Sequence, residues 1–119
     1  MPETNRIEHK QELTRDLDIE KEVIAFLNYN EGGYIFIGIN KKGKILGVND
    51  HDGDILKLKD RIKNNILPSC MGLFDVQAIV NKEKYIIKIT IASGSKTPHF
   101  KKKYVMTETG GIIRRRSAA

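Results

Sequence analysis

The first clear pattern along the chain is helical, with apolar residues returning every three to four positions over residues 18–29. The residues that share this helix face are Ile19, Val23, Phe26 and Leu27. Asp18 stands directly before the first of them and carries the short carboxylate that caps helix N-termini. The pattern therefore predicts an amphipathic helix that begins at Asp18.

A second helical stripe lies near the middle of the chain. We expect Asp54 to cap this helix and Pro68 to end it, because the residue before a proline is biased away from helical geometry. The expected buried positions are Ile55, Leu58, Ile62 and Ile66. Basic residues occupy much of the remaining surface, so this helix also buries a single face.

Between these helices, the segment Tyr34–Ile39 is apolar on both of the faces that a strand presents. Strict alternation places Ile35, Ile37 and Ile39 on one face and the two aromatic residues on the other. A strand of this kind is usually central in its sheet. Turn residues follow at 40–43, and we expect residues 45–48 to return beside the strand as its hairpin partner.

Later stretches show the two-residue alternation of strands. The sequence predicts a short strand within residues 5–10, a hairpin over 74–80 and 85–91 with its turn at 81–83, and a last hairpin over 104–106 and 112–115. The order is β-α-β-β-α-β-β followed by a C-terminal hairpin. This order predicts one α+β domain over residues 1–119, with a mixed, mainly antiparallel sheet and both helices on one face.

The net charge of +6 is confined to the last fifth of the sequence. Residues 96–119 hold seven Lys or Arg side chains and one acidic residue, Glu108, whereas residues 1–95 are neutral. A basic segment of this kind indicates a polyanionic partner such as nucleic acid. A solubilising tail is the alternative.

Motifs in the rest of the chain give this charge a context. Asn28 and Gly32-Gly33, followed by Gly38 and Gly47, have the order and spacing of the Schlafen AlbA-like family, which the chain resembles over most of its length. Further matching segments are Glu8-His9-Lys10, Ile66-Leu67-Pro68, residues 93–100 and Ile113-Arg114. The resemblance implies a nucleic-acid-binding domain with DNA favoured over RNA, the N-terminal module of a longer transcriptional regulator, and a homodimer as one assembly.

Two basic runs form the expected binding surface. Lys101-Lys102-Lys103 and Arg114-Arg115-Arg116 meet across the last hairpin, where alternation turns Arg115 away from its two neighbours. Such side chains neutralise phosphates without reading sequence, and aromatic rings among them can stack on unpaired bases. Tyr104 is equally well explained as a residue at the edge of the core. The candidate set is Lys96, His99, Lys101, Lys102, Lys103, Tyr104, Arg114, Arg115 and Arg116.

The resemblance also leaves open a metal-dependent nuclease. Glu3 and Glu8 have the Glu-x4-Glu spacing of the carboxylate pair in Schlafen-type RNA-cleaving domains, where Mg²⁺ or Mn²⁺ activates water. Those nucleases use a third acid after the Gly-Gly strand, and Asn40 or Lys41 occupies that position here. Substitutes in the next loop are Asp50, Asp52 and Asp54.

Other features carry less weight. Glu8 is equally explained as an ion-pair partner of Lys10 or Lys21, and residues 94–97 lack the adjacent Gly-Lys of a phosphate loop. The single cysteine, Cys70, is expected to be a packing residue in a reducing, cytoplasmic setting. No apolar run is long enough to span a bilayer, and only the nuclease alternative requires a cofactor. A protein-interaction module with an acidic partner is the remaining alternative.

Overall fold

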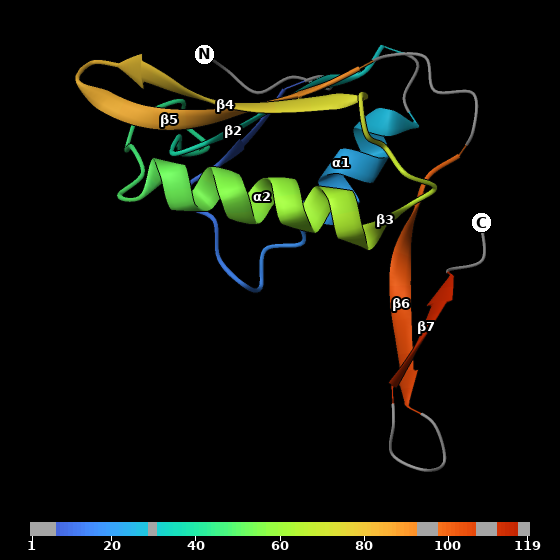
Figure 1. Cartoon of the computed structure of the whole chain (residues 1–119). Coiled ribbons are helices and arrows are strands. Elements are labelled where there is room, and N and C mark those ends of the chain that lie inside the picture. Colours follow the sequence, from blue (N-terminus) through green and yellow to red (C-terminus); the bar gives the residue numbers. More distant parts are fainter. Residues whose placement is uncertain (1–6, 29–30, 93–97, 107–111, 117–119) are drawn as a thin grey trace.

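The computed structural model describes residues 7–28, 31–92, 98–106 and 112–116, with side chains described as far as Lys102. Within these ranges the chain forms two helices and seven strands (Figure 1). They are β1 (Ile7–Lys10), α1 (Ile19–Leu27), β2 (Gly33–Ile37), α2 (His51–Asn65), β3 (Ile66–Leu67), β4 (Phe74–Asn81), β5 (Lys84–Ile91), β6 (Phe100–Met106) and β7 (Ile112–Arg116). The order of helices and strands is the expected one for this α+β chain, with two differences. Residues 45–48 form no strand, and β3 is an additional short strand.

Four of the strands form the main sheet, in the order β1-β2-β5-β4. β1 runs parallel to β2, whereas the β2–β5 and β5–β4 pairs are antiparallel, so the sheet is mixed and mainly antiparallel as predicted. β2 has a strand on each side, which confirms its central position. The other three strands form a second sheet in the order β3-β6-β7.

Both helices pack on the same face of the main sheet, as their apolar stripes predicted (Figure 1). Burial of their apolar side chains against the central strands is the main favourable contribution to folding. Cys70 lies in this core, where burial raises the pKa of its thiol, so its expected packing role is confirmed. The core residues from the helices are Ile19, Val23, Phe26, Leu27, Leu58 and Ile62. In the part of the chain that the structure describes, neither helix is long and apolar enough to cross a membrane.

The N-terminus of one helix lies where the sequence predicted it, and the N-terminus of the other does not. α1 begins after Asp18, whose Oδ1 accepts a hydrogen bond from the Lys21 N–H at 3.1 Å, as expected. α2 begins earlier than expected, because Asp50 rather than Asp54 is its N-cap and accepts from the Gly53 N–H at 3.1 Å. Gly53 permits this cap, since a Cβ at that position would collide with the Asp50 carboxylate. The expectation of a cap at Asp54 was therefore wrong by one turn.

The expected strand over residues 45–48 is reduced to a single bridge between Ile39 and Ile45. The physical reason is that β1 and β5 already occupy both edges of β2, which leaves no edge for a hairpin partner. The segment crosses towards β5 instead, where the Val48 N–H donates to the Tyr85 carbonyl oxygen at 2.8 Å.

Gly38 changes the direction of the chain at the end of β2. The N–H groups of Gly38 and Ile39 both donate to the carbonyl oxygen of Lys10, at 2.8 and 3.3 Å. Gly38 has φ +104°, and a Cβ there would lie 3.1 Å from Ile86 Cγ2, so the position favours glycine on both grounds. Ile39 consequently packs with Phe36 and Ile86 on the face away from the helices. Strict alternation had placed it on the helix side, and that expectation was wrong because the regular strand ends at Gly38.

β4 and β5 form the predicted hairpin and pair along their whole length, from Phe74 opposite Ile91 to Asn81 opposite Lys84. Lys82 and Glu83 connect them with φ values of 53° and 66°. Two successive residues with positive φ are typical of a type I′ turn, whose twist matches that of the paired strands. The turn lies where the sequence predicted it.

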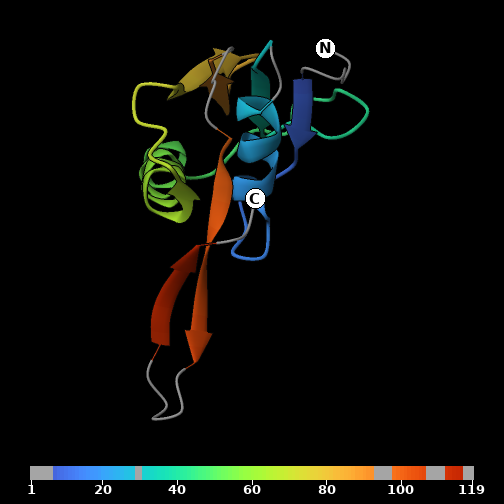
Figure 2. The same cartoon turned by 90° about the vertical axis from the view of Figure 1, so that its right-hand side faces the viewer.

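The predicted C-terminal hairpin is also present. β6 pairs with β3 near its beginning and then continues with β7 as a two-stranded arm that extends away from the main sheet and both helices (Figures 1 and 2). The β6–β7 register runs from Lys102 opposite Arg116 to Met106 opposite Ile112.

Candidate nucleic-acid interface

The register of the β6–β7 hairpin brings the two basic runs of the sequence side by side. Lys102 pairs with Arg116, and Lys103 pairs with Arg115, while Tyr104 pairs with Arg114. Like charges directly opposite each other in an antiparallel pair destabilise it. The register therefore pairs positively charged residue types with one another along the two strands.

Asn28 attaches the beginning of this arm to the end of α1. Its side-chain Nδ2 donates to the His99 carbonyl oxygen at 3.1 Å, and the His99 N–H donates to Asn28 Oδ1 at 3.0 Å. The amide side chain thus bonds both backbone groups of one residue, as a neighbouring strand would. β3 adds two further pairings, Ile66 with Lys101 and Leu67 with Phe100.

The helix-end motif therefore has a structural explanation. Asn28 also caps the C-terminus of α1, where its backbone N–H donates to the Ile24 carbonyl oxygen at 3.0 Å. Gly32 has φ 66°, the left-handed conformation expected where the chain leaves the helix and turns into β2. Asn28 and Gly32 together direct the chain towards both the main sheet and the arm.

Of the candidate binding residues, three have described side chains. His99 is only 5% exposed, so its ring offers little surface to a base. It belongs to the buried beginning of the arm, next to α1. Lys101 is exposed, with its Nζ 3.2 Å from Asp18 Oδ1, and Lys102 is half-buried. Lys96 lies outside the described residues, and for the remaining candidates only the strand and register are described. Those are Lys103, Tyr104, Arg114, Arg115 and Arg116.

Asp18 links the beginning of β6 to the N-terminus of α1, through its ion pair with Lys101. Burial alone raises the pKa of its carboxyl, but the hydrogen bond from the Lys21 N–H and the charge of Lys101 outweigh it, so the pKa lies below its ordinary value. The carboxylate therefore stays ionised and partly neutralises Lys101. A phosphate at this point would compete with Asp18 for Lys101.

A cleft of about 440 Å³ lies beside this ion pair. Lys21 and Lys101 contribute cations to it, and Ile24, Pro98 and Phe100 contribute apolar surface. Lys21 was not among the candidates, because in sequence it belongs to a neutral region far from the arm. Only the packing of α1 beside β6 brings it to the interface.

On the other helix, Arg61 of α2 holds the buried carboxylate of Glu20. Arg61 donates from Nε to Glu20 Oε2 at 3.0 Å and from Nη2 to Oε1 at 2.6 Å, and Asn65 Nδ2 donates to Oε2 at 2.8 Å. Burial would raise the pKa of Glu20, but these hydrogen bonds from Arg61 and Asn65 outweigh it and lower the pKa below its ordinary value. Arg61 Nη2 also donates to the Leu17 carbonyl oxygen at 2.6 Å, which ties α2 to the segment before α1.

The nuclease alternative requires carboxylates that the described residues do not assemble. Glu3 lies outside the described residues. Glu8 lies in β1, with its Oε2 3.8 Å from Lys10 Nζ, which agrees with its alternative role as an ion-pair partner. Within residues 7–28, 31–92 and 98–102, no group of three or more His, Cys, Asp or Glu side chains is placed to hold a metal ion.

The position of the third acid has a different role in this chain. Asn40 Oδ1 accepts hydrogen bonds from the N–H groups of Lys42 and Lys44, each at 2.9 Å, and so closes the turn after β2. The adjacent pocket of about 440 Å³ is lined by Lys10, Lys41 and Lys42, among others. Asp50 in the next loop is occupied as the α2 cap. These residues do not fit a divalent metal, because cations and a bonded amide stand where carboxylate ligands are needed.

The chain belongs to the Schlafen AlbA_2 family, which it matches over residues 3–118. Its fold is similar to that of the N-terminal domain of a RecG-related protein from Nitrosomonas europaea, named after an ATP-dependent DNA helicase. The TM-score is 0.70 and the identity 24%, over 100% of this chain and 83% of that one. The fold is also similar to part of the DIP2311 protein from Corynebacterium diphtheriae, with a TM-score of 0.57 and 18% identity over 94% of this chain but 22% of that one. No curated protein matches the chain.

Proposed function

We propose that this domain binds nucleic acid, with DNA as the preferred form, mainly through the β6–β7 arm. The observation that carries the proposal is the register that pairs Lys102 with Arg116 and Lys103 with Arg115. A phosphate group beside these pairs removes their mutual repulsion. It also releases the counterions condensed on the nucleic acid, which adds a favourable, sequence-independent contribution.

Three further points support the proposal. The arm extends from the body, so a nucleic acid can reach it without opening the core (Figures 1 and 2). Tyr104, opposite Arg114, is positioned in sequence to stack on an unpaired base beside a cation. The structural neighbour from Nitrosomonas europaea is named after a DNA helicase, which favours DNA over RNA.

The proposal has finer parts that rest on the family resemblance and on composition. The domain acts as the N-terminal module of a transcriptional regulator, as a monomer or a homodimer. A cytoplasmic location rests on the single cysteine of the chain, Cys70, which is buried and forms no disulfide.

Fluorescence anisotropy with labelled single- and double-stranded DNA and RNA, titrated across salt, tests this proposal. The variant Arg114→Gln/Arg115→Gln/Arg116→Gln should bind at least about tenfold more weakly at low salt. Its slope of log K against log[salt] should be smaller by about 2 to 3, since each lost phosphate contact removes about 0.9.

The matched control is Lys41→Gln/Lys42→Gln/Lys44→Gln, which removes the same charge from the turn after β2. If both variants lose affinity equally, binding follows net charge and not the arm, and the assignment of the site is wrong. If the unsubstituted protein binds none of the four nucleic acids even at low salt, the proposed function itself is wrong.

A further inference from the structure

β4 is an edge strand of the main sheet with one side unpaired. It pairs with β5 alone, and among the described residues no backbone hydrogen bond reaches its outer side. Proteins usually protect such edges with lysine, proline, a bulge or a covering element. β4 is eight residues long, and its sequence contains no lysine or proline and a single charged residue, Asp75. This edge is therefore open to pairing with another strand.

The turn at one end of β4 determines which backbone groups point outwards. A two-residue type I′ loop closes on a hydrogen-bonded pair, here Asn81 and Lys84, and such pairs alternate along an antiparallel ladder. The hydrogen bond from the Ala92 N–H to the Leu73 carbonyl oxygen, at 2.8 Å, agrees with this alternation of hydrogen-bonded pairs. Val76, Ala78 and Val80 consequently direct their N–H and C=O groups away from β5.

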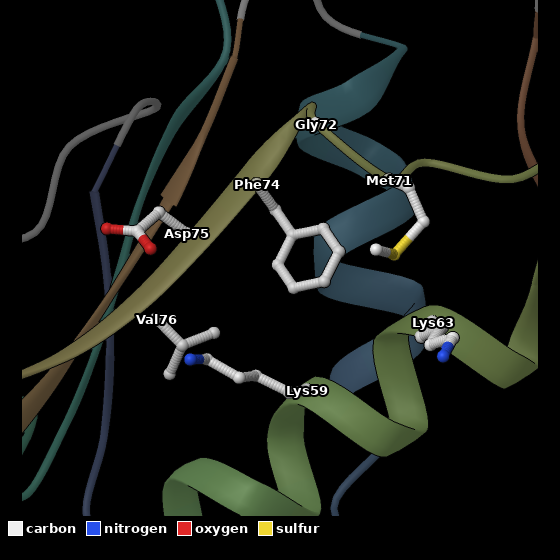
Figure 3. Close-up of a pocket in the computed structure, with 7 residues that line it drawn as sticks. All are labelled: Lys59, Lys63, Met71, Gly72, Phe74, Asp75 and Val76. Carbon is white, nitrogen blue, oxygen red and sulfur yellow. The ribbon is translucent and has the colours of Figure 1, made fainter.

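A groove accompanies this edge on the helix side (Figure 3). Its volume is about 350 Å³, and Phe74 and Val76 of β4 together with Met71 supply its apolar lining. Met71 is 59% exposed and Val80, further along the strand, is 61% exposed. Apolar surface thus continues along the open edge, where a strand added to β4 would cover it.

Two lysines of α2 border the groove. Figure 3 shows Lys59 reaching from the helix towards Val76, with Lys63 one turn further along. Asp75 also lines the groove, and its carboxylate is directed away from both lysines in this view. Neither lysine has an ion-pair partner among the described residues. The groove therefore combines an apolar floor with two lysines that outnumber its one acidic lining residue, Asp75.

From this combination we infer that the outer edge of β4 and the groove beside α2 form a docking site for an extended acidic segment of a partner protein. The segment adds a strand to the sheet, bonding the outward groups of Val76, Ala78 and Val80. Its side chains on the helix side are alternately apolar, to cover Phe74 and Val76, and acidic, to reach Lys59 and Lys63. A second copy of the chain suits the site less well, because pairing two β4 edges brings the lysines of two α2 helices together. The arm is not part of this site, so the inference is independent of the proposed function.

NMR titration of the isotope-labelled protein with two synthetic octapeptides tests the inference. One repeats Thr-Glu-Thr-Val, which places glutamate and valine on one face of a strand, and the other repeats Thr-Lys-Thr-Val. The acidic peptide should shift the amide signals of Met71–Val80 and of Lys59–Lys63, and it should slow hydrogen exchange at Val76, Ala78 and Val80. The basic peptide should do neither.

Variants separate the two parts of the site. Lys59→Glu/Lys63→Glu should weaken binding of the acidic peptide by about tenfold, since two charge contacts are reversed. Lys57→Glu is the control, because Lys57 lines a different pocket of the same helix. Ala78→Pro should abolish binding by removing an outward N–H that the fold itself does not use, whereas Ala78→Ser should not.

Several results would overturn the inference. They are equal binding of both peptides, shifts confined to other regions, no shift at millimolar peptide, and an equal loss from Lys57→Glu. Protection of the same amides that grows with protein concentration in the absence of peptide would assign the edge to a second copy. Shifts of the same groove signals by a thymidine oligonucleotide, without any by the acidic peptide, would assign it to nucleic acid. If Ala78→Pro does not fold, the lysine variants still decide the question.

Discussion

At the scale of single residues, Asn28 connects two segments that lie 71 positions apart in the sequence. Its side chain makes both hydrogen bonds to the His99 backbone, at 3.1 and 3.0 Å, in a partly buried position. Loss of a side chain that satisfies partly buried backbone groups leaves both groups without a protein partner. Asn28 should therefore affect the stability of the arm more than its place at a helix end suggests.

We expect Asn28→Ala to lower the free energy of unfolding by about 2 kcal/mol, because two partly buried backbone groups lose their partner. Urea denaturation measures the change, and hydrogen exchange should show the His99 amide opening faster. Asn64→Ala is the control, since the Asn64 side chain donates to Asp60 Oδ1, in an exposed position on α2. An equal loss in both variants would contradict the special role of Asn28.

Arg61 and Glu20 provide the second prediction at this scale. Glu20 is 2% exposed, so removal of the arginine leaves a buried carboxylate without its main counter-charge. Arg61→Met should lower the free energy of unfolding by about 3–5 kcal/mol at neutral pH. The double variant Glu20→Gln/Arg61→Met should recover part of this loss, and no recovery would mean that Arg61 acts through packing alone.

The same pair gives a pH dependence with a definite sign. The folded-state pKa of Glu20 lies below its ordinary value of 4.5, so the folded state favours the ionised form. The stability gained is complete above pH 4.5 and is lost as the pH falls through the lowered value. In Arg61→Met, the hydrogen bonds from Arg61 no longer oppose the effect of burial, which then raises the pKa of Glu20. The contribution of Glu20 to the free energy of unfolding should therefore fall as the pH rises. Urea midpoints between about pH 3 and pH 7, compared with those of Glu20→Gln, measure this contribution.

At the scale of elements, the β4–β5 turn has an unfavourable backbone conformation that the pairing of its two strands stabilises. Lys82 and Glu83 both have positive φ, a conformation that side chains with a Cβ disfavour. Eight paired positions on each strand and the burial of Ile87 and Ile89 hold the turn in place. The turn type follows from the two-residue connection and not from the preference of these residues.

Lys82→Asn combined with Glu83→Gly should raise the free energy of unfolding by about 1 kcal/mol, because both new residues accept positive φ more readily. Thermal and urea unfolding measure the gain. Glu83→Val is the opposite control and should destabilise the hairpin, since a β-branched residue resists this conformation. If both changes left stability the same, the turn in solution would differ from type I′.

At the scale of the whole molecule, the helix-side core does not depend on the arm. Among the residues whose side chains the structure describes, the buried members of this core lie between Ile19 and Ile91, and the strand that pairs with β7 in the described ranges is β6. The arm is joined to the body through β3, through Asn28 and through the ion pair of Lys101 with Asp18. Folding and the proposed binding are thus carried by separate parts of one chain.

A chain ending at Ala92 should accordingly keep its fold and lose most of its affinity for nucleic acid, since the core stays and the basic pairs are removed. Circular dichroism and a two-dimensional NMR spectrum check the fold, and anisotropy checks binding. The shortened chain should melt at a lower temperature, because the β3–β6 pairing and the Asn28 contacts are lost. Retained affinity in a folded, shortened chain would move the interface to the body.

The sequence by itself determined the features that depend on local patterns. Helical and strand periods located both helices, the central strand β2, the β4–β5 hairpin and the terminal hairpin, since these periods reflect which side of an element is buried. The distribution of Lys and Arg along the sequence located the basic segment that forms the arm, because charge can be counted without a structure. Most of the proposed nucleic-acid interface was accordingly predictable.

The tertiary structure decided what depends on neighbours. β5 occupies the edge of β2 that residues 45–48 would have used, and Gly38 carries Ile39 to the opposite face. Lys21 joins Lys101, and Asn28 bonds to His99, only because α1 packs beside β6. The open side of β4 likewise follows from the strand order, in which β4 is an edge strand that pairs with β5 among the described residues. Periodicity describes one element at a time, whereas edges, clefts and bonds between distant segments are properties of their arrangement.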